Sequence, residues 1–324
     1  MSITPVFIFS APRSGSTLVQ RVLAAHEGVA TSSEPWILLP MLTPLRDDVP
    51  AGSGRDALVR EALEDFVRAL PGGRADYLAA VRSAALDLYQ EVGGPDARWF
   101  VDKTPLYHLV VDEIVEAFPE GRFVFLWRNP LSVVASTVEL FDAGRWEVGR
   151  YTMALFESVE DLVAASQRHA DVSHSVRFEE LVGEGEAPWR ALLEYVGVPF
   201  EPEALERFAD IRLEGRKGDP TGQLLYRRLD PEPLEKWRGT INTSVRKAWC
   251  RRYLRWIGDD RLSHMGYDPA ALLTELDTRE RPSLADLEDA GRLAASLLRD
   301  SVKWVVPQHS GGRSAWADLV ARRR

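Results

Sequence analysis

Residues 6–18 have the pattern of a buried strand, a tight turn and the start of a helix in immediate succession. Val6 to Phe9 form an uninterrupted apolar run, which is typical of a central strand covered on both faces. Pro12 and Gly15 mark the turn, and apolar residues then recur at helical spacing, so we expect a helix to begin near Ser16. Free N–H groups and the positive dipole end of such a helix meet at the turn, which predicts an anion site.

The side chains of this turn add to the predicted anion site. Arg13 contributes a guanidinium group, and Ser14, Ser16 and Thr17 contribute three hydroxyls. The nucleotide-triphosphate pattern GxxxxGK[ST] is not matched, because Ser10 replaces its first glycine and Ser16 replaces its lysine. Arg13 supplies the cation from within the turn instead. An alternative is that the glycine and serines only form the corner and cap the helix.

Residues 11–17, Ala-Pro-Arg-Ser-Gly-Ser-Thr, resemble the 5'-phosphosulfate loop of sulfotransferases that use 3'-phosphoadenosine 5'-phosphosulfate (PAPS). The form of the loop resembles carbohydrate, tyrosylprotein and bacterial members more than cytosolic ones, which carry lysine at the position of Arg13. The resemblance implies direct in-line transfer of a sulfuryl group to an acceptor hydroxyl, with no metal. The residues that it implies for binding the 5'-phosphosulfate are Arg13, Ser14, Gly15, Ser16 and Thr17.

Four more strand patterns alternate with helical patterns along the chain. They cover Val29–Thr31, Trp99–Val101, Phe123–Trp127 and Ser175–Phe178. The alternation predicts an α/β fold with a parallel, doubly wound sheet. With the resemblance, we expect a P-loop-like three-layer sandwich, in which helices flank the central parallel sheet. Arg13, Glu34, Lys103 and Arg128 each follow a strand, so they should converge at the edge where ligands of such sheets bind.

The resemblance covers most of residues 5–268, and we expect a sulfotransferase domain at residues 1–268. A helical insertion is predicted at about residues 36–98, over the C-terminal edge of the sheet. Residues 269–324 are expected to form a C-terminal helical extension. Ser283 and Asp286 resemble a capping box there, for a helix that runs to about Trp304.

A second anion site is predicted at residues 128–136. Asn129 as N-cap and Pro130 at the first helical position are a strong helix start, and Arg128 precedes it. Ser132 and Ser136 lie one turn apart on the same helix face. The stretch resembles the 3'-phosphate motif of sulfotransferases, an Arg and a Ser eight residues later, which assigns Arg128 and Ser136 to the 3'-phosphate. The alternative is that the serines only allow close helix packing and Arg128 is a solvated strand end.

Glu34 and Lys103 are the candidate catalytic residues, together with Arg13. The spacing of Glu34 from the turn resembles tyrosylprotein sulfotransferases, in which a glutamate there is the catalytic base. Pro35 should keep Glu34 extended, although a first-turn glutamate that complements the dipole of the helix after Pro35 is the alternative. Lys103 is the candidate cation for the transferring group, or else a surface lysine paired with Asp102. His108 is the alternative base.

Two later segments resemble parts of the nucleotide site. Residues 218–222 and Lys236-Trp237 match the place where related enzymes have a loop closing on the nucleotide, which assigns Thr221 and Lys236 to nucleotide binding. A polar surface turn explains these short matches equally well. Residues 175–181 resemble the RYExL segment of the family, with Phe178 in place of the tyrosine.

Composition narrows the function classes. The net charge of −9 disfavours nucleic-acid binding, and Cys250 as the only cysteine excludes a disulfide framework and a cysteine-based metal site. No signal-peptide pattern and no apolar run of about 18 residues is present, so we expect a cytoplasmic protein without a transmembrane segment. No metal-ligand spacing occurs near the loop.

These observations together favour a PAPS-dependent sulfotransferase. The acceptor is expected to be a carbohydrate or glycolipid hydroxyl, because Trp36, Phe141, Trp146 and Tyr151 are candidates for stacking on sugar faces. Small-molecule, polyketide and tyrosyl-peptide acceptors are alternatives. Two other functions remain open on the sequence alone, an ATP- or GTP-dependent kinase on a P-loop-like fold and a non-catalytic nucleotide-binding protein.

Overall fold

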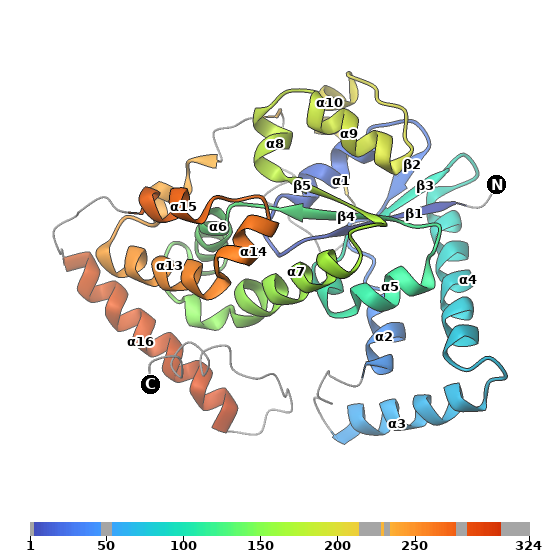
Figure 1. The fold of residues 1–324 in the computed structure, drawn as a ribbon, viewed down its shortest axis with the longest axis horizontal. Coiled ribbons are helices and arrows are strands. Elements are labelled where there is room, and N and C mark those ends of the chain that lie inside the picture. The colour runs from blue at the N-terminus through green and yellow to red at the C-terminus, as the bar shows by residue number, and fades with distance from the viewer. Residues whose placement is uncertain (1–2, 47–53, 214–227, 230–233, 277–283, 306–324) are drawn as a thin grey trace.

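The computed structural model describes residues 3–46, 54–213, 228–229, 234–276 and 284–305 (Figure 1). Its centre is a five-stranded parallel sheet with the strand order β2-β3-β1-β4-β5. The strands are β1 (Thr4–Phe9), β2 (Val29–Thr31), β3 (Trp99–Asp102), β4 (Arg122–Trp127) and β5 (Ser173–Arg177). All five predicted strands and their parallel arrangement are confirmed. The last one ends a residue earlier than predicted, because Phe178 already belongs to the next helix.

Helices occupy both faces of this sheet. The α-helices before β5 are α1 (Ser16–Ala24), α2 (Leu38–Leu42), α3 (Gly54–Ala69), α4 (Arg74–Gly93), α5 (Val111–Ala117), α6 (Pro130–Asp142) and α7 (Ser158–Arg168). Those after it are α8 (Phe178–Gly183), α9 (Ala187–Val196), α10 (Ala204–Arg207), α12 (Trp237–Thr240), α13 (Ser244–Ile257), α14 (Asp259–His264), α15 (Pro269–Glu275) and α16 (Leu284–Val305). Short 3-10 or π turns are η1 (Thr43–Leu45), η2 (Pro105–Val110), η3 (Val148–Arg150), η4 (Met153–Glu157) and η5 (Phe208–Asp210).

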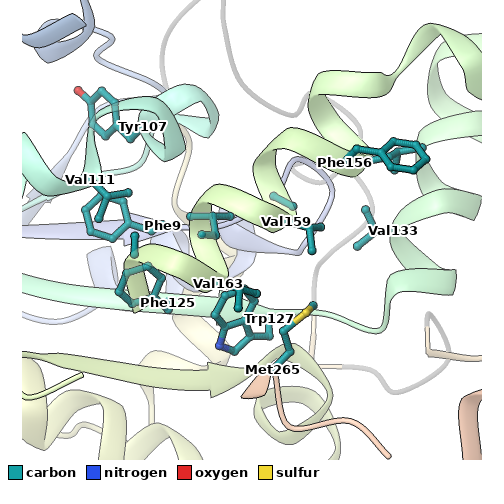
Figure 2. Packing of buried hydrophobic residues seen from close by; sticks show 14 of the residues in the cluster. Phe9, Tyr107, Val111, Phe125, Trp127, Val133, Phe156, Val159, Val163 and Met265 are labelled. Carbon is teal, nitrogen blue, oxygen red and sulfur yellow. The ribbon is translucent and has the colours of Figure 1, made fainter. Parts of the chain in front are cut away.

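Alternate residues of β1 enter two separate hydrophobic cores. Phe7 and Phe9 belong to the core that includes residues of α4, α5, α6, α7 and α13. Figure 2 shows Phe9 beside Phe125, and the centroids of the two rings are 5.3 Å apart. Val6 and Ile8 belong to the core formed with α1, α8, α9 and α10. The apolar run of β1 is therefore buried on both sides, and the predicted three-layer sandwich is confirmed.

The insertion after β2 is helical, and its helix α4 packs on a face of the sheet at β2 and β3. One face of α4 carries the buried residues Leu78, Val81, Ala85 and Tyr89, and this helix contacts β2, β3 and α5. The preceding helix, α3, contacts η1 and α4 and lies far from the strands (Figure 1). The apolar face of α4 accounts for this placement, because its buried residues join the core that contains Phe7, Phe9 and Phe100.

The C-terminal helices pack against the rest of the chain. The buried carboxylate of Asp289 on α16 accepts hydrogen bonds from Thr243 (2.8 Å) and from Arg246 at the start of α13 (2.7 Å). Asp286 accepts a hydrogen bond from the backbone N–H of Val245 (3.1 Å). The predicted helix to about Trp304 is confirmed, whereas its predicted cap residue Ser283 lies outside the described residues.

Candidate functional site

The loop between β1 and α1 leaves the first turn of the helix without a side-chain cap. Its N-cap residue is Gly15, with φ of 89°, and Arg13 also has a positive φ of 70°. The first N–H groups of any α-helix have no intrahelical acceptor, so these groups are available to an anion at the carboxyl edge of β1. Ser14, Ser16 and Thr17 are all buried around this turn.

Gly15 is required by its surroundings as well as by its backbone conformation. A Cβ atom at this position would lie 2.3 Å from the ring of Phe178, the first residue of α8. The guanidinium carbon of Arg128 lies 4.7 Å from the centroid of the same ring, a cation–π contact. Phe178 therefore touches both the loop at Gly15 and the arginine that follows β4.

The two predicted phosphate sites are in direct contact with each other, where the sequence suggested separate sites. Arg13 Nε donates a hydrogen bond to Ser136 Oγ on α6 (3.1 Å). Arg128 Nη1 donates to the backbone carbonyl of Arg13 (2.8 Å). The loop after β1 and the helix after β4 thus hold one another, because parallel neighbours bring both strand ends to the same edge.

Two buried polar atoms at this place have no hydrogen-bond partner among the described residues. They are Arg128 Nε and Ser132 Oγ, and the latter lies in the first turn of α6. Buried polar groups in proteins are nearly always hydrogen-bonded, so atoms of this kind suggest an absent ligand. A donor nitrogen just after β4 and a hydroxyl in the first turn of α6 fit an anionic group such as a phosphate.

The turn that presents Arg128 is held by one predicted residue and by two others. Asn129 caps α6 as predicted, accepting a hydrogen bond from Leu131 N–H (2.9 Å). The backbone N–H of Asn129 donates to Glu179 (2.8 Å), and Glu179 also accepts from the buried Tyr267 hydroxyl (2.8 Å). Glu179 lies in the RYExL-like segment 175–181, which is therefore the sequence signal for this contact.

Glu34 and Lys103 form a buried ion pair. Lys103 Nζ lies 2.7 Å from Glu34 Oε1, and the two side chains are 3% and 9% exposed. The second carboxylate oxygen, Oε2, accepts a hydrogen bond from the indole N–H of Trp36 (3.0 Å). Glu34 lies outside any helix, as Pro35 predicts. The following helix, α2, begins only at Leu38, so Glu34 does not belong to its first turn, as the helix-dipole alternative requires.

Gln20 ties the segment that leads to Glu34 to helix α1. Its fully buried side-chain amide donates to Thr31 Oγ1 (2.7 Å) and to the carbonyl of Ser32 (2.6 Å). The segment bearing Glu34 is thereby fixed against the helix that begins at the candidate phosphate loop. A glutamine within the apolar pattern of that helix was the only sequence signal for this link.

Lys103 is not the surface lysine paired with Asp102 that was the alternative. Asp102 is fully buried and accepts hydrogen bonds from the hydroxyls of Tyr89 (2.6 Å), Tyr107 (2.8 Å) and Thr104 (3.2 Å). Burial raises the pKa of Asp102 from its usual 3.8 to about 6, and these hydroxyl donors limit the rise.

The remaining predicted site residues are His108, Lys236 and Thr221. The ring of His108 is buried, and its Nδ1 lies 2.7 Å from Asp161 of α7, so it belongs to another pair. Lys236 is exposed just before α12, and Thr221 lies outside the described residues.

In the described ranges, no group of three or more His, Cys, Asp or Glu side chains could hold a metal ion. None of the helices described is long and apolar enough to cross a membrane.

Comparisons with known proteins show the family to which the chain is similar. Residues 5–202 match the profile of the sulfotransferase family. The chain is 26% identical to nodulation protein NoeE of Sinorhizobium fredii over 298 residues, which are 81% of this chain but only 65%, less than two thirds, of NoeE. It is 24% identical to protein-tyrosine sulfotransferase 1 of Danio rerio, over 82% of this chain and 73% of that protein.

Two solved structures similar to this one are sulfotransferase domains. One comes from the curacin biosynthetic pathway, with a TM-score of 0.48 and 22% identity over 82% of this chain and 98% of that domain. The other comes from the Synechococcus PCC 7002 olefin synthase, with a TM-score of 0.47 and 24% identity over 73% of this chain and 88% of that domain.

Proposed function

Because the chain belongs to the sulfotransferase family, we propose that it transfers a sulfuryl group from PAPS to an acceptor hydroxyl. One observation carries the choice of donor. Two anion sites lie in contact at one edge of the sheet, and Arg128 Nε and Ser132 Oγ are buried there without partners among the described residues. A nucleotide with phosphates at both its 5' and 3' positions supplies two anions of the required kind.

Each phosphate has its own set of proposed ligands. The 5'-phosphosulfate is bound by the N–H groups at the start of α1 and by the side chains of the loop, namely Arg13, Ser14, Ser16 and Thr17. The 3'-phosphate is bound by Arg128 with Ser132 and Ser136 on α6. Thr221 and Lys236 remain proposed nucleotide ligands on the basis of the sequence resemblance alone.

The proposed reaction uses Glu34 as the base, and Lys103 and Arg13 as cations. Glu34 takes the proton of the acceptor hydroxyl while the hydroxyl oxygen forms its bond to sulfur. The bond between sulfur and the 5'-phosphate oxygen breaks, and the products are the sulfate ester and 3',5'-adenosine bisphosphate. Lys103, held 2.7 Å from Glu34, and Arg13 neutralise negative charge that develops on the departing oxygen.

For the acceptor, we propose a carbohydrate or glycolipid hydroxyl, with a tyrosyl peptide as the alternative. Phe141 is 54% exposed and stacks on Tyr151 with centroids 5.5 Å apart, a surface on which a sugar face could pack. Trp146 was wrong as a candidate for this contact, because it is fully buried against Trp249. The indole of Trp36 is engaged by Glu34.

Calorimetry with two nucleotides tests the donor. We expect 3',5'-adenosine bisphosphate to bind tightly without metal and ATP·Mg²⁺ to bind far more weakly. Comparable affinities, or a requirement for Mg²⁺, would contradict the proposal and favour a kinase.

Labelled PAPS with a panel of sugars, glycolipids, phenols and tyrosyl peptides tests the acceptor. Transfer to sugars that weakens in Phe141→Ala supports the carbohydrate proposal. Transfer to tyrosyl peptides alone refutes it and leaves the sulfotransferase activity standing.

A further inference from the structure

Trp36 has an unusual backbone conformation beside the proposed base. Its φ is 59°, in the left-handed region that residues with side chains seldom occupy. Conformations of this kind persist only where neighbouring contacts determine them, and they are frequent at functional sites. Two contacts do so here, because the backbone N–H of Trp36 donates to Thr104 Oγ1 (3.3 Å) and its indole N–H donates to Glu34 Oε2 (3.0 Å).

The hydroxyl of Thr104 is itself fixed from the other side. It donates its proton to Asp102 Oδ1 (3.2 Å), and therefore offers a lone pair to the N–H of Trp36. The other oxygen of Asp102 accepts hydrogen bonds from Tyr89 on α4 (2.6 Å) and from Tyr107 on η2 (2.8 Å). Hydrogen bonds thus connect Asp102 to the carboxylate of Glu34 through Thr104 and Trp36, whereas the two tyrosines reach only the far oxygen of Asp102.

We propose that Thr104 is a positioning residue, which orients Glu34 through Trp36, and that Asp102 fixes the Thr104 hydroxyl for this task. The inference rests on the proposed function, in which Glu34 is the base. Lys103 holds one carboxylate oxygen of Glu34, and Trp36 holds the other. Two fixed oxygens define the plane of the carboxylate, and with it the direction from which it can accept a proton.

If this network had a purely structural role, different effects of its hydrogen bonds would be expected. The hydroxyls of Tyr89 and Tyr107 both donate to the buried carboxylate of Asp102, at shorter distances than the hydroxyl of Thr104 does. If the network served only to satisfy that carboxylate, the bonds from Tyr89 and Thr104 would have equivalent effects. If Thr104 orients Glu34, its loss affects turnover, whereas the loss of the Tyr89 hydroxyl does not.

Thr104→Val is the test variant, because it keeps the side-chain shape and removes the hydroxyl. Thr104→Ser restores the hydroxyl, and Tyr89→Phe is the matched control, which removes another bond to the same carboxylate. We expect Thr104→Val to lower kcat by about 10- to 100-fold, as misplaced catalytic groups do. The affinity for 3',5'-adenosine bisphosphate should change less than about twofold, since neither anion site is touched.

Thr104→Ser should recover most of kcat, and Tyr89→Phe should lower the melting temperature without lowering kcat. The indole N–H resonance of Trp36, assigned by its loss in Trp36→Phe, gives a second readout that needs no turnover. It should shift in Thr104→Val and stay in place in Tyr89→Phe. If Thr104→Val does not fold, Trp36→Phe carries the kinetic test, and the same loss of kcat is expected.

Equal losses of kcat in Thr104→Val and Tyr89→Phe would overturn the inference, as would an unchanged indole resonance in Thr104→Val. If the unmodified chain transfers no sulfuryl group to any acceptor, the proposed function fails. The resonance then still decides whether Thr104 holds Trp36 and Glu34, so the two failures are distinguishable.

Discussion

The buried pair of Glu34 and Lys103 makes a quantitative double-mutant cycle possible. The variants are Glu34→Gln, Lys103→Met and the double substitution. At 2.7 Å and an effective dielectric constant of about 20, the gross Coulomb attraction between the two charges is about 6 kcal/mol. Desolvation offsets much of it, but removing one partner leaves the other charge buried, at a cost of about 3–5 kcal/mol.

We therefore expect each single variant to lose about 3 kcal/mol of unfolding free energy in urea titrations near neutral pH. The double variant should lose clearly less than the sum, because neither charge is then left alone. Saturating 3',5'-adenosine bisphosphate should also restore more of the lost unfolding free energy in Glu34→Gln than in Lys103→Met. The reason is that the bound anion gives Lys103 a new counter-charge.

The kinetic arm of the same cycle tests the base. General-base catalysis contributes roughly 10²–10⁴-fold, so Glu34→Gln should lose transfer by about that factor. On the stability side, the coupling is refuted if the losses of unfolding free energy in the two single variants sum to the loss in the double variant within about 0.5 kcal/mol. Full transfer activity in Glu34→Gln would remove Glu34 from the mechanism and move the base to His108.

Three other variants test neighbouring features. Because burial raises the pKa of Asp102 to about 6, the folded chain holds this proton more tightly than the unfolded chain does. The unfolding free energy of the unmodified chain, relative to that of Asp102→Asn, should therefore fall by about 2 kcal/mol as pH rises from about 4 to 7. The same pH dependence of the unfolding free energy in both proteins, measured by urea titration, would contradict this. Gly15→Ala places a Cβ 2.3 Å from Phe178 at positive φ, so thermal unfolding should show a loss of about 2–4 kcal/mol that Phe178→Leu partly relieves. Arg128→Ala should weaken binding of 3',5'-adenosine bisphosphate by about 1.5–3 kcal/mol in calorimetry, and normal affinity would refute its role.

The parts of the fold that follow from local chemistry could be predicted from the sequence. The apolar run of β1, the glycine at positive φ and the cap formed by Asn129 and Pro130 all act within a few residues. The parallel arrangement follows from the alternation of strands and helices. It brings the strand-end residues to one edge, where Arg13 and Arg128 are in contact.

The contacts that orient the candidate site could not be predicted, because they join residues far apart in sequence through single side-chain atoms. No local pattern indicates that Tyr89 of the insertion reaches Asp102, or that Trp36 turns its indole back onto Glu34. The burial of Trp146 was missed for the same reason, since its partner Trp249 lies in a helix a hundred residues later. Such partnerships depend on tertiary packing, which periodicity does not encode.

The central place of β1 in the sheet has a consequence for the order in which the chain folds. Thr4 pairs with Trp99 on one side, and Val6 pairs with Arg122 on the other, so both partner strands come much later in the chain. Closing loops of this length is slow compared with forming local helices. Until then the apolar run from Val6 to Phe9 has no partner and favours aggregation. Refolding yield should therefore fall steeply as the protein concentration rises, even for a chain whose finished structure is stable.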